Sequence, residues 1–113
     1  MVDARDFRVS VNITAEVVKN GQRYEAIIDN LSDEGLMMTV FPSDTIDLSP
    51  GKKLDIEFKT PSGENVVMHC IIMRLVSEDK DKMAFTLGLR ILEKSTEYED
   101  FFKSVFIKEM GIL

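Results

Sequence analysis

Residues 24–41 read YEAIIDNLSDEGLMMTVF, and the rest of the chain is organised around this stretch. Two apolar runs, 24–28 and 36–41, have an apolar side chain at every second position and flank the polar segment 29–35. Alternation with a period of two is typical of half-buried β-strands. Asn and Ser side chains can hydrogen-bond the local backbone, and Gly35 tolerates positive φ. The segment is therefore predicted to be a loop that joins two strands at one rim of a sheet.

The preceding residues predict a β-hairpin. Apolar and polar residues alternate strictly over residues 9–17, as a half-buried strand requires. Asn20-Gly21 follows, and both residues accept the positive φ of a type I′ turn. The return strand is predicted at residues 22–29.

Three further strands are predicted after residue 41, at residues 53–59, 65–76 and 83–92. The strand at 65–76 is apolar on both faces, which predicts that it is covered on both sides. Six antiparallel strands joined by short turns bury one face most economically by curling into a small barrel. The predicted fold class is therefore mainly β.

The apolar period then changes to that of a helix. Thr96-Glu97-Tyr98-Glu99 matches a capping box, with Thr96 as the predicted cap. Apolar and aromatic side chains between Tyr98 and Met110 recur on one face, so the C-terminal helix is predicted to be amphipathic. Its apolar stripe is expected either to plug the mouth of the barrel or to pack on the second apolar face of the strand at 65–76.

Length and composition restrict the class of protein. A chain of 113 residues, 44% hydrophobic and 30% charged, predicts a single globular domain. No apolar run is long enough for a membrane span and no leader opens the chain, so a cytoplasmic protein without membrane insertion is expected. The net charge of −6 argues against binding to a nucleic-acid polymer. A small anionic ligand remains compatible with it, because a few arginines can form a local positive pocket.

The sequence contains no evident catalytic pair. His69 and Cys70, the only histidine and cysteine, are neighbours in a predicted strand and should point to opposite faces. Segment 29–35 does not match an EF-hand loop, because Leu31 stands where the third-position oxygen ligand is required. We therefore predict that the protein is not an enzyme and carries neither a metal site nor a cofactor.

Two arginines precede the first predicted strand, Arg5 and Arg8. A guanidinium group is a planar fork of donors that fits guanine O6 and N7 and also grips phosphate. The alternative from spacing alone is that both are solvated charges on a flexible N-terminal tail, residues 1–7.

Taken together, these features resemble a PilZ domain, a family of bacterial receptors for cyclic di-GMP. Residues 30–35, NLSDEG, match the [Asp/Asn]-x-Ser-x-x-Gly motif of that family. Residues 88–91, GLRI, resemble its Gly-hydrophobic-Arg-hydrophobic stretch. The order of strands, hairpin and helix agrees over almost the whole chain. The resemblance implies a six-stranded antiparallel PilZ-like (split) β-barrel with a C-terminal helix, spanning residues 8–113.

The tail motif of the family, Arg-x-x-x-Arg, is only partly matched. Arg8 stands at the last arginine, whereas Ala4 stands at the first and Arg5 comes one position later. Acidic residues also surround the expected site: Asp3, Asp6, Asp33 and Glu34.

The resemblance implies that Arg5, Arg8, Asn30 and Ser32 contact the ligand, and that Gly35 lets the loop turn close to it. The implied function is a second-messenger receptor that binds cyclic di-GMP and relays the signal to an unidentified downstream protein. The incomplete tail motif and the acidic surroundings motivate an alternative, a degenerate PilZ-like domain that binds no nucleotide and acts as a protein-interaction adaptor.

Overall fold

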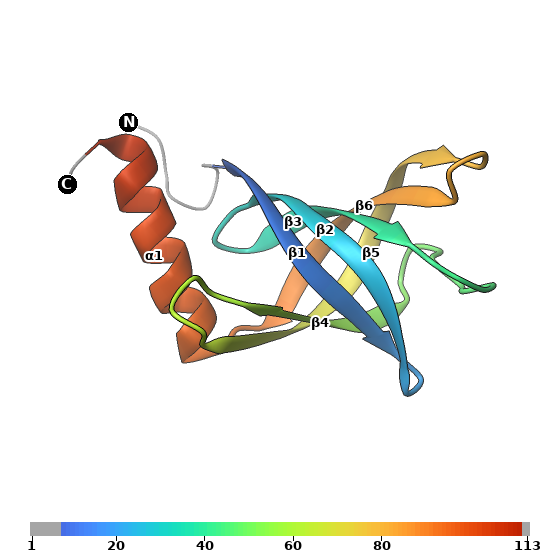
Figure 1. The fold of residues 1–113 in the computed structure, drawn as a ribbon, viewed down its shortest axis with the longest axis horizontal. Coiled ribbons are helices and arrows are strands. Elements are labelled where there is room, and N and C mark those ends of the chain that lie inside the picture. The colour runs from blue at the N-terminus through green and yellow to red at the C-terminus, as the bar shows by residue number, and fades with distance from the viewer. Residues whose placement is uncertain (1–7, 112–113) are drawn as a thin grey trace.

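The computed structural model describes residues 8–111; the predicted tail, residues 1–7, lies outside the described residues. Six antiparallel strands form a closed barrel in the order β1-β2-β3-β6-β5-β4 (Figure 1). One helix follows the last strand. This architecture confirms the predicted fold class. The bounds are β1 Val9–Lys19, β2 Gln22–Leu31, β3 Gly35–Phe41, β4 Lys53–Lys59, β5 Asn65–Asp79, β6 Ala84–Glu93 and α1 Thr96–Met110.

The barrel is built from hairpins and closed by a short seam. The β1–β2 turn has positive φ at Asn20 (53°) and Gly21 (77°), which confirms the predicted type I′ turn. Strands β1 and β4 close the barrel by pairing only around Val17 and Ile56. Side chains that alternate inward from all six strands fill the interior, among them Val17, Ile28, Met38, Ile56, Met68 and Leu87, all fully buried.

Strand β5 is covered on one side only, so the prediction that both of its faces are covered is wrong. Its inward side chains are buried, but Val67 is 38% exposed and Met73 is 52% exposed. The reason is the position of helix α1, which lies at one end of the barrel instead of on the outer face of β5 (Figure 1). The outer surface of β5 is left open to solvent.

Helix α1 plugs the barrel end, one of the two positions expected for it. Tyr98 and Phe102 of the helix are buried against the barrel. The ring of Phe101, also on the helix, meets the ring of Phe58 on β4 edge to face, with the ring centres 5.3 Å apart. The cap is Ser95, not Thr96 as predicted, because the Ser95 side chain accepts the hydrogen bond from the Tyr98 backbone N–H. Within residues 8–111, no helix combines the length and the apolar character needed to cross a bilayer.

Candidate ligand-binding site

The motif loop is shorter than predicted and tightly closed. Strand β2 continues to Leu31, so Asn30 belongs to the strand and not to the loop. The Ser32 backbone N–H donates to the Gly35 carbonyl at 2.8 Å. The Ser32 hydroxyl donates to the same carbonyl at 3.1 Å and accepts from the Gly35 N–H at 3.0 Å. Three hydrogen bonds between the same two residues therefore fix the turn.

Ser32 hydrogen-bonds the local backbone, as expected for a serine in a polar turn. The residue is 3% exposed, although it lies on the wall of a pocket. A hydroxyl has one proton and two lone pairs, and Gly35 occupies the proton and one lone pair. In this arrangement Ser32 can offer a ligand only its remaining lone pair, or its proton after the hydroxyl rotates.

Gly35 is required for a close approach and not for positive φ. Its φ lies outside the left-handed region, contrary to the expectation for a turn glycine. A Cβ at this position would lie 2.6 Å from the backbone oxygen of Leu89 on β6. The Ile91 N–H also donates to the Glu34 carbonyl at 2.8 Å. The loop is therefore pressed directly against the backbone of β6.

Arg8 and Asn30, two of the predicted site residues, are in contact. The Arg8 Nη1–H donates to Asn30 Oδ1 at 3.0 Å, and the amide nitrogen of Asn30 contacts the Met37 sulfur at 3.6 Å. Arg8 is thus held beside the motif by the strand that follows it. Arg5 lies outside the described residues.

Asn30 begins a row of residues that crosses the outside of the barrel. Cross-strand pairing places Asn30 of β2 opposite Met37 of β3. Met37 lies opposite Gly88 of β6, and Gly88 lies opposite Arg74 of β5. Arg90 pairs with Gly35 in the next outward-facing position. Apart from Asn30, which lies at its edge through the contact with Arg8, these residues belong to an open pocket of about 400 Å³, lined by Arg8, Ser32, Glu34, Gly35, Met37, Met73, Arg74, Gly88, Leu89 and Arg90.

The pocket is positively charged in a protein whose net charge is −6. Arg8, Arg74 and Arg90 line it, against one carboxylate among its lining residues, Glu34. Asp33, expected to oppose an anionic ligand, is paired with Lys94 at 3.2 Å. The acidic surroundings inferred from the sequence are thus partly neutralised in the described part of the chain; Asp3 and Asp6 lie outside it.

Comparison with known proteins adds family evidence to this geometry. The model of the PilZ domain matches residues 3–105, most of the chain. The chain belongs to the PilZ domain family. PilZ domains are receptor and adaptor modules, which agrees with the prediction that the protein is not an enzyme. A comparison with curated proteins gave no match.

Two solved structures have a similar fold. The Bacillus subtilis inhibitor of motility, MotI/DgrA, matches with a TM-score of 0.74 at 10% identity over 97% of this chain and 53% of that one. This chain therefore spans about half the length of that protein. The PilZ domain of Escherichia coli YcgR with c-di-GMP matches with a TM-score of 0.67 at 17% identity, over 94% and 91% of the two chains. At these identities the likeness concerns the fold alone.

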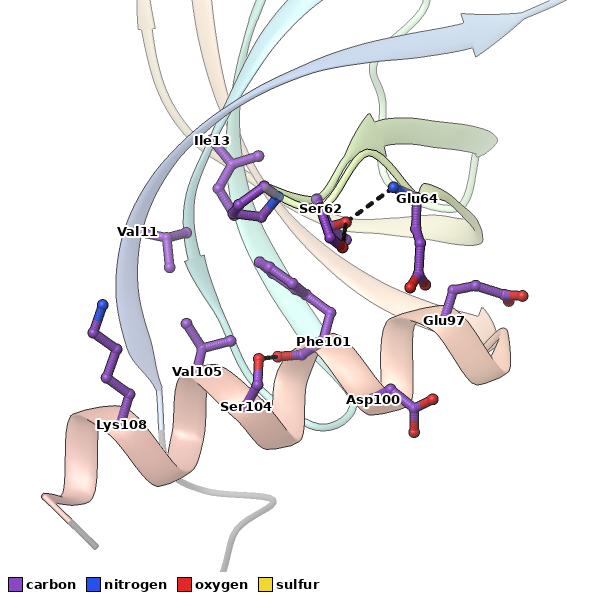
Figure 2. A pocket seen from close by; sticks show the side chains of 12 residues that line it. Val11, Ile13, Ser62, Glu64, Glu97, Asp100, Phe101, Ser104, Val105 and Lys108 are labelled. Atoms are coloured by element: carbon purple, nitrogen blue, oxygen red, sulfur yellow. Dashed lines mark hydrogen bonds between the residues drawn. The ribbon is translucent and has the colours of Figure 1, made fainter. Parts of the chain in front are cut away.

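A larger groove of this PilZ domain lies under the helix and has the opposite charge. It measures about 750 Å³ and lies between α1, β1 and the β4–β5 turn. Figure 2 shows Phe101 and Val105 reaching from the helix toward β1, so the floor of the groove is apolar. Its charged lining residues are Glu64, Glu97, Asp100 and Lys108. Three carboxylates against one ammonium make this groove a poor site for an anion, despite its size.

The PilZ barrel separates His69 from Cys70, as predicted. Cys70 is buried inside the barrel, and burial raises the pKa of its thiol to about 12. His69 is exposed on the outer face, where its Nδ1 lies 2.6 Å from Asp55 Oδ1. Over residues 8–111, His, Cys, Asp and Glu side chains form no cluster that could hold a metal ion. A neutral, buried thiol with no base beside it is not a nucleophile.

The His69–Asp55 pair predicts a small pH dependence of stability. The hydrogen bond that His69 donates to the Asp55 carboxylate, followed by the charge of that carboxylate, raises the pKa of His69 above the ordinary value of 6.5. The stabilisation is therefore complete below about pH 6.5 and is lost as the pH rises through the folded-state pKa. Because both side chains are about half exposed, we expect a loss of less than about 1 kcal/mol. Urea denaturation from pH 5.5 to 8.5 would measure it, and a slope that persists in His69→Gln would contradict this assignment.

Proposed function

We propose that this PilZ domain is a receptor that binds cyclic di-GMP at the arginine-lined pocket beside the motif loop. The single observation that carries the proposal is the 3.0 Å hydrogen bond between Arg8 and Asn30. It brings the last arginine of the tail motif against the first residue of the loop motif, although 21 residues separate them in the chain. The c-di-GMP present in the YcgR PilZ structure supports the choice of ligand.

The chemistry of the pocket suits this ligand. Cyclic di-GMP carries two phosphates and two guanines, and a guanidinium group recognises both. Arg8 uses one of its five N–H donors on Asn30, so most of its donors remain available to a ligand. Arg5 would approach from the tail, and Asn30 would add polar contacts. No cofactor is needed for binding of this kind, and a receptor for a nucleotide second messenger would act in the cytoplasm.

The motif loop is hydrogen-bonded to helix α1, which offers a route by which the signal can be relayed. The hydroxyl of Tyr98, on helix α1, donates to the Ser32 carbonyl at 2.6 Å. A ligand that shifts the motif loop would change this contact and, through it, the seating of the helix on the barrel. We propose that a downstream protein partner reads this change.

The alternative function is an adaptor that binds no nucleotide. Ala4 in place of the first tail arginine and the engagement of the Ser32 hydroxyl within its own loop favour it. This reading predicts a folded protein that gives no saturable response to any cyclic dinucleotide.

Isothermal titration distinguishes the two functions. We expect saturable binding of cyclic di-GMP by the wild-type protein and no comparable binding of cyclic di-AMP or GTP. Arg8→Ala should weaken binding by at least about tenfold, because a hydrogen bond to a charged group contributes about 1.5–3 kcal/mol. The stability of this variant without ligand should change by less than about 0.5 kcal/mol, because Arg8 is exposed.

Arg23→Ala is the matched control. Arg23 is also exposed, but it is paired with Glu16 and Glu57 on another part of the barrel. It should bind as wild type. Failure of the wild-type protein to bind would contradict the receptor function and favour the adaptor. Wild-type affinity in a folded Arg8→Ala variant would contradict this placement of the ligand.

A further inference from the structure

We infer that Arg74 supplies a second ligand-binding guanidinium of this site, on the barrel wall, in place of the tail arginine that position 4 lacks. The inference rests on the proposed function, because it concerns the same pocket and the same bis-guanine ligand. It adds a contact that neither the tail motif nor the loop motif contains. Recognition would then depend less on the spacing of the tail arginines.

The first argument is the orientation of the Arg74 side chain. A Cβ added at Gly88 would lie 3.1 Å from both Cγ and Nε of Arg74. The side chain therefore lies flat across β6, in space that any other residue at position 88 would partly fill. Its neighbours in the pocket include Met37 and Met73, which offer apolar surface beside the planar guanidinium. A guanine base can lie on such a surface with its face against the arginine.

The second argument is that the charged group of Arg74 is not paired with a carboxylate within the described chain. Neither the Arg74 guanidinium nor the Arg90 guanidinium forms a hydrogen bond or an ion pair with another residue of the range 8–111. Arg23 shows the contrast, because it contacts Glu57 at 3.2 Å. Three arginines from separate segments converge on one pocket, and an anionic ligand would relieve their mutual repulsion.

The third argument is the span of the site. Asn30 and Arg74 stand at the two ends of one cross-strand row that covers four adjacent strands. Three gaps of about 4.8 Å place the two backbone positions roughly 14 Å apart. Arg8 and Asn30 can hold one part of a dinucleotide while Arg74 contacts another, so a ligand with two guanines uses both ends of the row.

Titration of cyclic di-GMP into four single variants tests the inference. We expect Arg74→Ala to bind at least about tenfold more weakly than wild type. Arg74→Lys should be nearly as weak, because lysine keeps the charge but lacks the planar fork. Gly88→Ala retains every arginine and should bind a few-fold more weakly, because the new methyl displaces the Arg74 side chain. Arg23→Ala, which removes an equal charge elsewhere, should bind as wild type.

The outcomes separate this inference from the proposed function. No binding by the wild-type protein overturns both. Wild-type binding together with unchanged affinity in Arg74→Ala overturns the role of Arg74 alone. Wild-type affinity in Arg74→Lys overturns the planar contact and leaves only a charge effect. Circular dichroism of each variant verifies its fold, and an exposed position such as Arg74 is not expected to affect folding.

Discussion

Replacing Gly35 by alanine is expected to destabilise the domain by about 2–3 kcal/mol, at the upper end of the usual cost of overpacking. The added Cβ would meet the Leu89 backbone oxygen at 2.6 Å, closer than two such atoms can approach. The obstacle is backbone in a paired strand, so it cannot be relieved by rotating a side chain. Strands β3 and β6 must separate locally, which strains their hydrogen bonds and the loop that Ser32 and Gly35 close. Urea denaturation monitored by circular dichroism measures the change in the free energy of unfolding.

The control for this prediction is Gly88→Ala on the adjacent strand. There the same methyl group meets only the flexible side chain of Arg74, at 3.1 Å. We expect its stability to remain within about 0.5 kcal/mol of wild type, because Arg74 can move aside into solvent. Equal destabilisation of the two variants would show that the loss does not depend on the contact between position 35 and the Leu89 backbone. The specific contact between β3 and β6 would then be refuted.

The strands were predictable because their apolar period is local information. Each strand needs one inward face, and a period of two identifies that face without knowledge of the partner strand. The Asn20-Gly21 turn was predictable for the same reason, since its positive φ values depend on two adjacent residues. The family motif likewise located Arg8 and Asn30, which are in contact in the structure.

Arg74 could not be found in this way, because a bulge changes the face to which it belongs. Strict alternation from Cys70 and Ile72, both buried, would direct Arg74 into the barrel. The register between β5 and β6 instead shifts between Ile72 and Arg74, and Arg74 becomes exposed. A bulge depends on the pairing of two strands, which a single strand's pattern does not contain. The close approach of Gly35 to Leu89 could not be predicted from the sequence for the same reason, because it depends on the pairing of β3 with β6.

Replacing Tyr98 by alanine is expected to cost about 4 kcal/mol, the largest effect of any substitution considered. The ring is fully buried where helix α1 closes the barrel, and removal of a buried aromatic side chain costs about 3–5 kcal/mol. The substitution also removes the hydroxyl that donates to the Ser32 carbonyl at 2.6 Å. Burial raises the pKa of this hydroxyl above its ordinary value, so it stays protonated and able to donate throughout the neutral range. Urea denaturation should show the loss as a lower midpoint.

Tyr98→Phe separates the two contributions, because it keeps the ring and removes only the hydrogen bond. We expect it to cost about 1–2 kcal/mol, since the Ser32 carbonyl is left without its donor. If the proposed relay is correct, this variant should also bind cyclic di-GMP a few-fold differently from wild type, although Tyr98 does not line the pocket. A stability equal to wild type would mean that water replaces the hydroxyl at the Ser32 carbonyl. Unchanged affinity would mean that the position of the helix is not coupled to the loop. The exposed face of β5 would then be the candidate surface for the relay.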